Sequence, residues 1–263
     1  MTNMSNEILL ILSLILIYSF VLLAYYFFDI SGLYGWTVFC TITANIEVLL
    51  MVRAFGMEQT LGNVLFASSF LVTDIISEIG GKKQAQKAVN LGICTSCCFI
   101  LISQMWLLYT PSASDWASPA FHTIFSNTPR LLFASLLVYA VSQKFDVWAY
   151  HKWWAFTTKR FGNAEGFLWL RNNGSTLVSQ LLNTVMYTFG AFWGMYTLPV
   201  LLRICVSSYV IFVFTSLLDT PFVYMARRIK HKKDGSMIKK EKGYHYGQLS
   251  GLYPGTNEKS SGN

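Results

Sequence analysis

The chain has 263 residues, of which 53% are hydrophobic and only 13% are charged, and its net charge is +7. An ordinary soluble domain has about 25% charged residues, so this composition excludes one. Nine of the 20 basic residues follow Ala226, which indicates a basic tail near lipid headgroups and predicts no nucleic-acid partner.

Seven apolar stretches follow one another along the chain, each 17 to 27 residues long. A helix of about 20 apolar residues crosses the ~30 Å hydrocarbon layer of a membrane. Backbone groups in lipid must bond within their own segment, which favours helices. The sequence therefore predicts an all-α fold, a polytopic integral membrane helical bundle in contact with the lipid bilayer. The predicted spans are Ile8–Phe28, Gly32–Val52, Gly62–Glu78, Ala88–Tyr109, Arg130–Trp148, Asn173–Trp193 and Val200–Ala226.

Basic residues concentrate on alternate connections between these spans. Three Lys follow the third stretch, five Lys and Arg lie around the fifth connection, and nine lie in the tail, which makes 17 on one face. The other face has only Arg53, Arg130 and Arg203. Because Lys and Arg accumulate on the cytoplasmic side, we expect a multi-pass protein of the plasma (inner) membrane. Its N-terminus is predicted outside and its C-terminus in the cytoplasm.

The cysteines and histidines form no recognisable ligand set. Cys94, Cys97 and Cys98 are closely spaced, but no second Cys or His pair completes a zinc site. We interpret them as packing residues, and the sequence predicts no metal and no cofactor.

Five carboxylates lie inside the predicted spans, and ionisable groups at membrane depth are functional candidates because they are costly there. They are Glu47, Asp74, Glu78, Asp146 and Asp219. Asp74 and Glu78 are four residues apart and share a helix face, where two like charges favour holding a proton or sharing a cation. Glu78 and Asp146 have an alternative interpretation as interfacial partners of Lys82 and Lys144.

Polar side chains also form stripes at helical spacing. The sixth stretch has Asn173, Thr176, Gln180, Asn183 and Tyr187, and the fifth has Ser135, Tyr139, Ser142, Gln143, Asp146 and Tyr150. Thr41 and Asn45 are one turn apart in the second stretch. Such stripes indicate the walls of a polar cavity. A flat, neutral ligand rich in hydrogen-bonding groups, such as a nucleobase, suits amide, carboxylate and aromatic side chains.

Four stretches of the chain resemble the queuosine precursor transporter family, also described as a vitamin uptake family. The first combines Ala44-Asn45-Ile46 with Phe70–Glu78 and Gly80–Lys83; the second is Arg130, Ala134-Ser135, Tyr139, Ser142-Gln143 and Asp146; the third is Trp169–Gln180; the fourth is Asp219–Tyr224. Together they extend from about Ile42 to Tyr224. Four matches in order make the resemblance specific.

The resemblance implies a transporter that imports 7-deazaguanines for tRNA queuosine modification: 7-cyano-7-deazaguanine, 7-aminomethyl-7-deazaguanine or queuine. It implies six core helices at 32–228, with an additional N-terminal transmembrane helix at 1–31. Residues 229–263 are expected to form a basic cytoplasmic tail that is disordered. Proton coupling through Asp74 and Glu78 is a further hypothesis.

The resemblance and the polar stripes together predict the site residues. The substrate-binding candidates are Asn45, Asp74, Glu78, Tyr139, Gln143, Asp146, Arg171, Asn172, Asn173, Thr176, Gln180 and Asn183. The candidates for gating or coupling are Asp74, Glu78, Asp219 and Pro221. The chain departs from the family's pattern at Asn183, where a carboxylate is frequent, and near Ile211, where a basic residue is frequent.

Two other classes of function were weighed. A substrate-binding membrane subunit of a larger vitamin or nucleobase importer stays open, because the chain has no Gly-x4-Gly-Lys-[Ser/Thr] motif and would need a partner for ATP-driven transport. A membrane-embedded enzyme could use Asp74 with Glu78, or Asp146, as acid and base. The chain lacks a His-rich metal set and a Gly-x-Ser-x-Gly turn, so we predict that it is not an enzyme.

Overall fold

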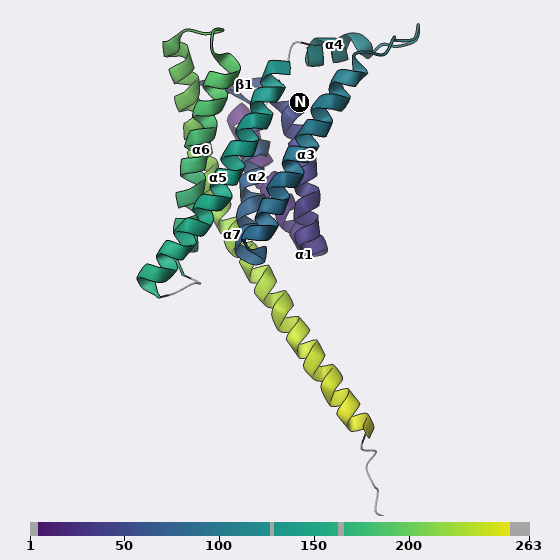
Figure 1. Ribbon diagram of the computed structural model, residues 1–263, viewed down its shortest axis with the longest axis vertical. Coiled ribbons are helices and arrows are strands. Elements are labelled where there is room, and N and C mark those ends of the chain that lie inside the picture. Colours follow the sequence, from purple (N-terminus) through teal and green to yellow (C-terminus); the bar gives the residue numbers. More distant parts are fainter. Residues whose placement is uncertain (1–4, 127–128, 163–165, 253–263) are drawn as a thin grey trace, which may run out of the picture.

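The computed structural model describes residues 5–126, 129–162 and 166–252, and this part of the chain is almost entirely helical (Figure 1). The elements are α1 (Asn6–Glu47), β1 (Met51–Ala54), β2 (Met57–Thr60), α2 (Gly62–Gly80), α3 (Lys82–Trp106), α4 (Ser118–Ser126), α5 (Pro129–Phe161), α6 (Leu168–Phe192) and α7 (Leu198–Leu252). β1 and β2 form an antiparallel hairpin. The hairpin and α4 lie at one end of the bundle, which we call the hairpin end, and α7 extends beyond the opposite end (Figure 1).

Four of the described helices are long and apolar enough to cross a membrane. They are α1, α2, α3 and the segment Leu198–Gly235 of α7. α5 and α6 have 33 and 25 residues, but they carry the two polar stripes, which lower their mean hydropathy. The predicted fold class, a helical membrane protein, agrees with this architecture. The count of six core spans plus one stays a prediction.

α1 unites the first two predicted spans and is sharply bent into two helical arms. The first arm precedes Asp29 and the second arm follows it. The bend is at Asp29, whose backbone has φ 54° and ψ −144°, a region that L-residues seldom adopt. The rings of Phe20 and Trp36 are 6.4 Å apart between centroids, whereas 16 residues would separate them by about 24 Å in a straight helix. The two arms therefore fold back against each other, and a bond of 2.5 Å from Lys233 Nζ to Asp29 Oδ1 ties α7 to the bend.

The two arms approach each other closely at Gly32. A Cβ atom at Gly32 would lie 2.1 Å from the backbone oxygen of Ala24, whereas one at Gly35 would meet nothing within 4 Å. We expect Gly32→Ala to separate the arms and to lower the thermal stability of the purified protein sharply, because backbone atoms cannot move aside as a flexible side chain can. Gly35→Ala is the matched control and should leave stability unchanged or raise it, since Ala is the better helix former. Equal melting temperatures for the two variants would contradict this packing.

α2 is the central helix of the bundle. Its residues from Phe70 to Ser77 are all buried, and it contacts α1, α3, α5 and α7. Small side chains such as Ala67, Ser68 and Ser69 allow this close approach. The first arm of α1, by contrast, buries one side and exposes large apolar side chains on the other, as a peripheral helix facing lipid does.

Several predicted boundaries differ from the structure. The second span was expected to reach Val52, but α1 ends at Glu47 and Val52 belongs to β1, because the segment pairs with β2. The fifth and sixth spans were expected to be Arg130–Trp148 and Asn173–Trp193, but α5 continues to Phe161 and α6 begins at Leu168.

The tail boundary at residue 228 is not marked by a helix end. α7 passes through Pro221 and is described as helix to Leu252, and residues 253–263 lie outside the described part of the chain. The division into 1–31, 32–228 and 229–263 stays a prediction.

Candidate functional site

A cavity of about 390 Å³ lies at the hairpin end, between the second arm of α1 and helices α2, α5, α6 and α7. Its volume is within the range of roughly 300–1,000 Å³ that is usual for small-molecule sites. Its polar lining side chains are hydroxyls and amides, and its aromatic ones include Phe66, Tyr139 and Phe212. The ring of Phe66 lies 6.1 Å from that of Tyr139 and 6.3 Å from that of Phe212. Among the described residues, no Asp, Glu, Lys or Arg lines this cavity.

Three of the predicted substrate-binding residues line the cavity: Asn45, Tyr139 and Asn183. They come from α1, α5 and α6. Thr41, Ser135 and Tyr187 of the predicted polar stripes line it as well. Tyr139 reaches this position past Gly92 of α3, where a Cβ atom would lie 2.0 Å from the tyrosine hydroxyl oxygen.

Beneath the cavity, a short hydrogen-bond chain joins the lining to the interior. Ser69 lines the cavity and accepts a hydrogen bond of 2.7 Å from Nε2 of Gln143. The hydroxyl of Thr73 donates to Oε1 of Gln143 at 3.1 Å. Gln143 is thus a buried link from α5 to α2, where its partner Thr73 directly precedes Asp74.

Three carboxyl groups are buried deeper in the bundle, each with a donor from α6. Thr176 donates to Oδ2 of Asp74 at 2.9 Å, Ser179 donates to Oδ1 of Asp146 at 2.7 Å, and Asn172 donates to Oδ1 of Asp219 at 2.7 Å. All three Asp side chains are essentially inaccessible to solvent. One residue of the α6 stripe, Thr176, and two residues next to the stripe, Asn172 and Ser179, thus donate to carboxylates of α2, α5 and α7.

Asn173 links α6 to α7 by hydrogen bonds next to Pro221. Its Nδ2 donates to the hydroxyl of Thr220 at 2.7 Å, and its Oδ1 accepts from Ser216 at 3.4 Å. Gln180 is buried on α6, and its Oε1 has no hydrogen-bond partner within the described residues.

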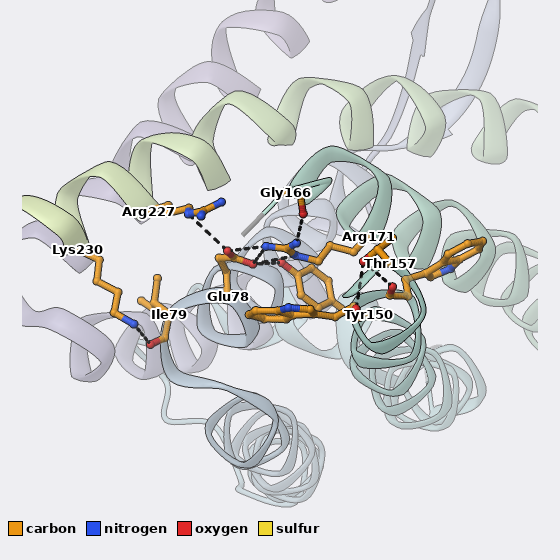
Figure 2. Close-up of polar contacts among 10 residues, drawn as sticks. Glu78, Ile79, Tyr150, Thr157, Gly166, Arg171, Arg227 and Lys230 are labelled. Atoms are coloured by element: carbon orange, nitrogen blue, oxygen red, sulfur yellow. Dashed lines mark hydrogen bonds and ion pairs between the residues drawn. The ribbon is translucent and has the colours of Figure 1, made fainter. Parts of the chain in front are cut away.

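Glu78 and Arg171 form the centre of an ionic cluster that joins four helices at the end opposite the hairpin (Figure 2). Nη2 of Arg171 is 2.7 Å from Oε1 of Glu78, and Nε is 3.0 Å from Oε2. The hydroxyl of Tyr150 donates to Oε2 at 2.8 Å, and Nε of Arg227 is 3.8 Å away from Oε1. The guanidinium of Arg171 also stacks on the ring of Trp154 at 4.3 Å. Glu78, Tyr150, Arg171 and Arg227 are called the ionic cluster below.

The ionic cluster changes the interpretation of Asp74 and Glu78, which were predicted to hold a proton or a cation as a pair. Glu78 is neutralised by Arg171 rather than by Lys82, and Asp146 is bonded by Ser179 rather than by Lys144. Glu78 therefore does not share a proton or cation with Asp74 in this structure. Asp74 instead lies against Asp146.

Comparison with known proteins identifies the family. Residues 60–226 match the family model described as "Putative vitamin uptake transporter". The chain belongs to this vitamin uptake transporter family. It is also similar to a "Probable queuosine precursor transporter" of Bacillus subtilis (strain 168), with 40% identity over 209 residues that cover 80% of this chain and 89% of the relative. No solved structure matches it.

Membership confirms the resemblance predicted from the four motifs. The protein is a multi-pass membrane transporter and not an enzyme. The matched region includes the cavity-lining parts of α2, α5, α6 and α7, whereas the whole of α1, with its cavity-lining residue Asn45, lies outside it.

Some contributors to the transporter's polar core were not predicted. Ser69 links the cavity to Gln143, and Thr73 continues the link. Ser69, Thr73 and Ser77 are spaced by four residues. The same helical spacing that marks the polar face of α6 therefore also marks this polar face of α2. Trp154 and Arg227 had no such signal, because their roles depend on helices that are distant in sequence.

Proposed function

We propose that this transporter imports queuosine precursors, the 7-deazaguanines that supply queuosine modification of tRNA. The observation that carries the proposal is the uncharged cavity, whose amides and hydroxyls suit the edges of a guanine-like ring and whose aromatic rings suit its faces. The printed name of the B. subtilis relative supports the same solute class.

The positions of the basic residues support an orientation of the transporter in the membrane. The first turn of α3, the last turns of α5 and the stretch Arg227–Lys233 of α7 carry Lys and Arg at the end opposite the hairpin. By the positive-inside rule this end faces the cytoplasm. The cavity then opens toward the outside, and the ionic cluster closes the cytoplasmic side, as alternating access about a midplane site requires.

The uncharged lining also sets an order among the substrates. An aliphatic amine is protonated at neutral pH, so 7-aminomethyl-7-deazaguanine would bring a cation into a cavity that has no carboxylate among its described lining residues. An unpaired ammonium costs more than about 1.4 kcal/mol to bury, which is about tenfold in affinity. We expect 7-cyano-7-deazaguanine to compete at least that much better for uptake.

The test uses cells that cannot make queuosine, lack their own importer and retain the later enzymes of the pathway. The chain is expressed alone, each precursor is supplied separately, and queuosine in tRNA is measured. The expected result is that queuosine modification is restored, most efficiently with 7-cyano-7-deazaguanine. Restoration only after co-expression of an ATP-hydrolysing complex would favour the alternative, a substrate-binding subunit of a larger importer. No restoration under either condition, with the protein in the membrane, would overturn the proposal.

A further inference from the structure

Two buried carboxyl groups, those of Asp74 on α2 and Asp146 on α5, face each other in the interior. Their donors, Thr176 and Ser179, are three residues apart on α6, which places the carboxyl groups side by side. Each has a second oxygen, Asp74 Oδ1 and Asp146 Oδ2, that receives no hydrogen bond from an N–H or hydroxyl group of the described chain. The two carboxyl groups interact, so the ionisation of each depends on the other.

Among the described residues, the surroundings of this pair supply no neutralising cation. Asp219 on α7 acts on both carboxyl groups with the same sign of charge. The hydroxyls of Tyr18 on α1 and Tyr150 on α5 lie within the field of Asp74. Arg171 on α6 and Arg227 on α7 are the nearby cations, and both are paired with Glu78.

We propose that Asp74 and Asp146 together bind one proton that crosses the membrane with each substrate molecule. Two ionised carboxylates in contact repel strongly in a medium of low dielectric constant, whereas one shared proton converts the repulsion into a hydrogen bond. The proposal rests on the proposed function, because it assigns the ion that drives the same transport cycle.

A proton fits this site better than a sodium ion. The hydroxyls of Thr176 and Ser179 donate to Asp74 Oδ2 and Asp146 Oδ1, which leaves one unbonded oxygen on each carboxyl group. Two oxygens suffice to share one proton, whereas a hard metal ion takes more oxygen ligands. In addition, no cluster of three or more His, Cys, Asp or Glu able to hold a metal ion occurs among the described residues.

The position of the pair links it to both ends of the transport path. On the cavity side, Thr73 precedes Asp74 and connects through Gln143 to Ser69 in the lining. On the other side, Glu78 and Tyr150 of the ionic cluster follow Asp74 and Asp146 by one helical turn each. The proton enters from water in the cavity, is held between the two carboxyl groups, and leaves to cytoplasmic water when the ionic cluster opens. One positive charge thereby crosses with each neutral substrate.

The first arm of the experiment detects the proton without transport. Infrared difference spectra of the purified full-length protein, between alkaline and acidic buffer, should show the C=O stretch of a protonated buried carboxyl group. Asp74→Asn and Asp146→Asn should each remove this band, and Asp29→Asn, which removes an exposed carboxylate, should keep it. A wild-type spectrum without a protonated carboxyl band that depends on Asp74 or Asp146 would overturn the proposal.

The second arm measures transport of 7-cyano-7-deazaguanine in proteoliposomes. A pH gradient of about one unit, acidic outside, should drive roughly tenfold accumulation if one proton crosses per substrate, and a sodium gradient should drive none. Asp146→Asn mimics the protonated pair, so it should still exchange labelled for unlabelled substrate while losing accumulation. Asp146→Glu, which keeps a titratable group, should retain part of the accumulation and covers the case in which the Asn variant does not fold.

The outcomes separate the two proposals. Accumulation driven by sodium, or by the pH gradient in a folded Asp146→Asn variant, would overturn the proton site while leaving the proposed substrate intact. Absence of any exchange by the wild type would contradict the proposed function, and the infrared arm would still decide whether the pair holds a proton.

Discussion

Replacing Arg171 by Met is expected to destabilise the transporter strongly, because it leaves the carboxylate of Glu78 buried without its bidentate partner. Glu78 is only 5% exposed at its side chain. Breaking a buried ion pair from one side costs about 3–5 kcal/mol. The prediction is checked by thermal unfolding of the purified protein in detergent. Arg228→Met, which removes an exposed arginine next to Arg227, is the matched control and should unfold like the wild type.

The double variant Glu78→Leu with Arg171→Met separates stability from gating. It removes both charges of the buried pair, and the side chain of Arg227, which loses Glu78 as a partner, is 18% exposed to solvent, so most of the lost stability should return. Because the ionic cluster joins α2, α5, α6 and α7 at the closed end, we expect this variant to bind substrate but to lose it again by rapid efflux. Efflux from preloaded proteoliposomes measures this directly. Efflux and accumulation equal to those of the wild type would show that the ionic cluster contributes to stability alone.

Replacing Asn183 by Leu is expected to weaken substrate binding by about 1–3 kcal/mol, or roughly tenfold to a hundredfold, because a buried hydrogen-bonding partner of the ligand is lost. Asn183 lines the cavity from α6 and is nearly inaccessible to solvent. The dissociation constant for 7-cyano-7-deazaguanine, measured by calorimetry, is the readout. Val178→Leu changes an exposed position of the same helix and should leave the constant unaltered. An unchanged constant for Asn183→Leu would place the substrate elsewhere.

Asn183→Asp tests whether the same position influences the choice between the two substrates. It adds a carboxylate to a lining that has none among the described residues, and an ammonium group can pair with it. We expect the preference for 7-cyano-7-deazaguanine over 7-aminomethyl-7-deazaguanine to narrow or reverse in competition assays. A preference that stays the same would indicate that the 7-substituent points away from α6.

The twelve predicted binding residues separate into layers once the helices are packed. Only Asn45, Tyr139 and Asn183 line the cavity, while Gln143 lies below it and Asp74, Asp146 and Thr176 lie deeper. Helical periodicity identifies the face on which a polar residue lies, but it does not give its depth in the assembled bundle. Residues of one stripe can therefore contact substrate, satisfy a carboxylate or join two helices.

By itself, the sequence determined the properties that depend on neighbouring residues: the apolar stretches, the asymmetry of basic residues, the polar faces of α5 and α6, and the motifs of the family. Partners that are distant along the chain were decided only by the tertiary structure. Glu78 pairs with Arg171, 93 residues away, Asp74 lies against Asp146, and Asp29 bends α1 so that its arms pack together. The physical reason is that a buried charge is neutralised by whichever group packing brings within a few ångströms, and packing depends on the contacts of all the helices at once.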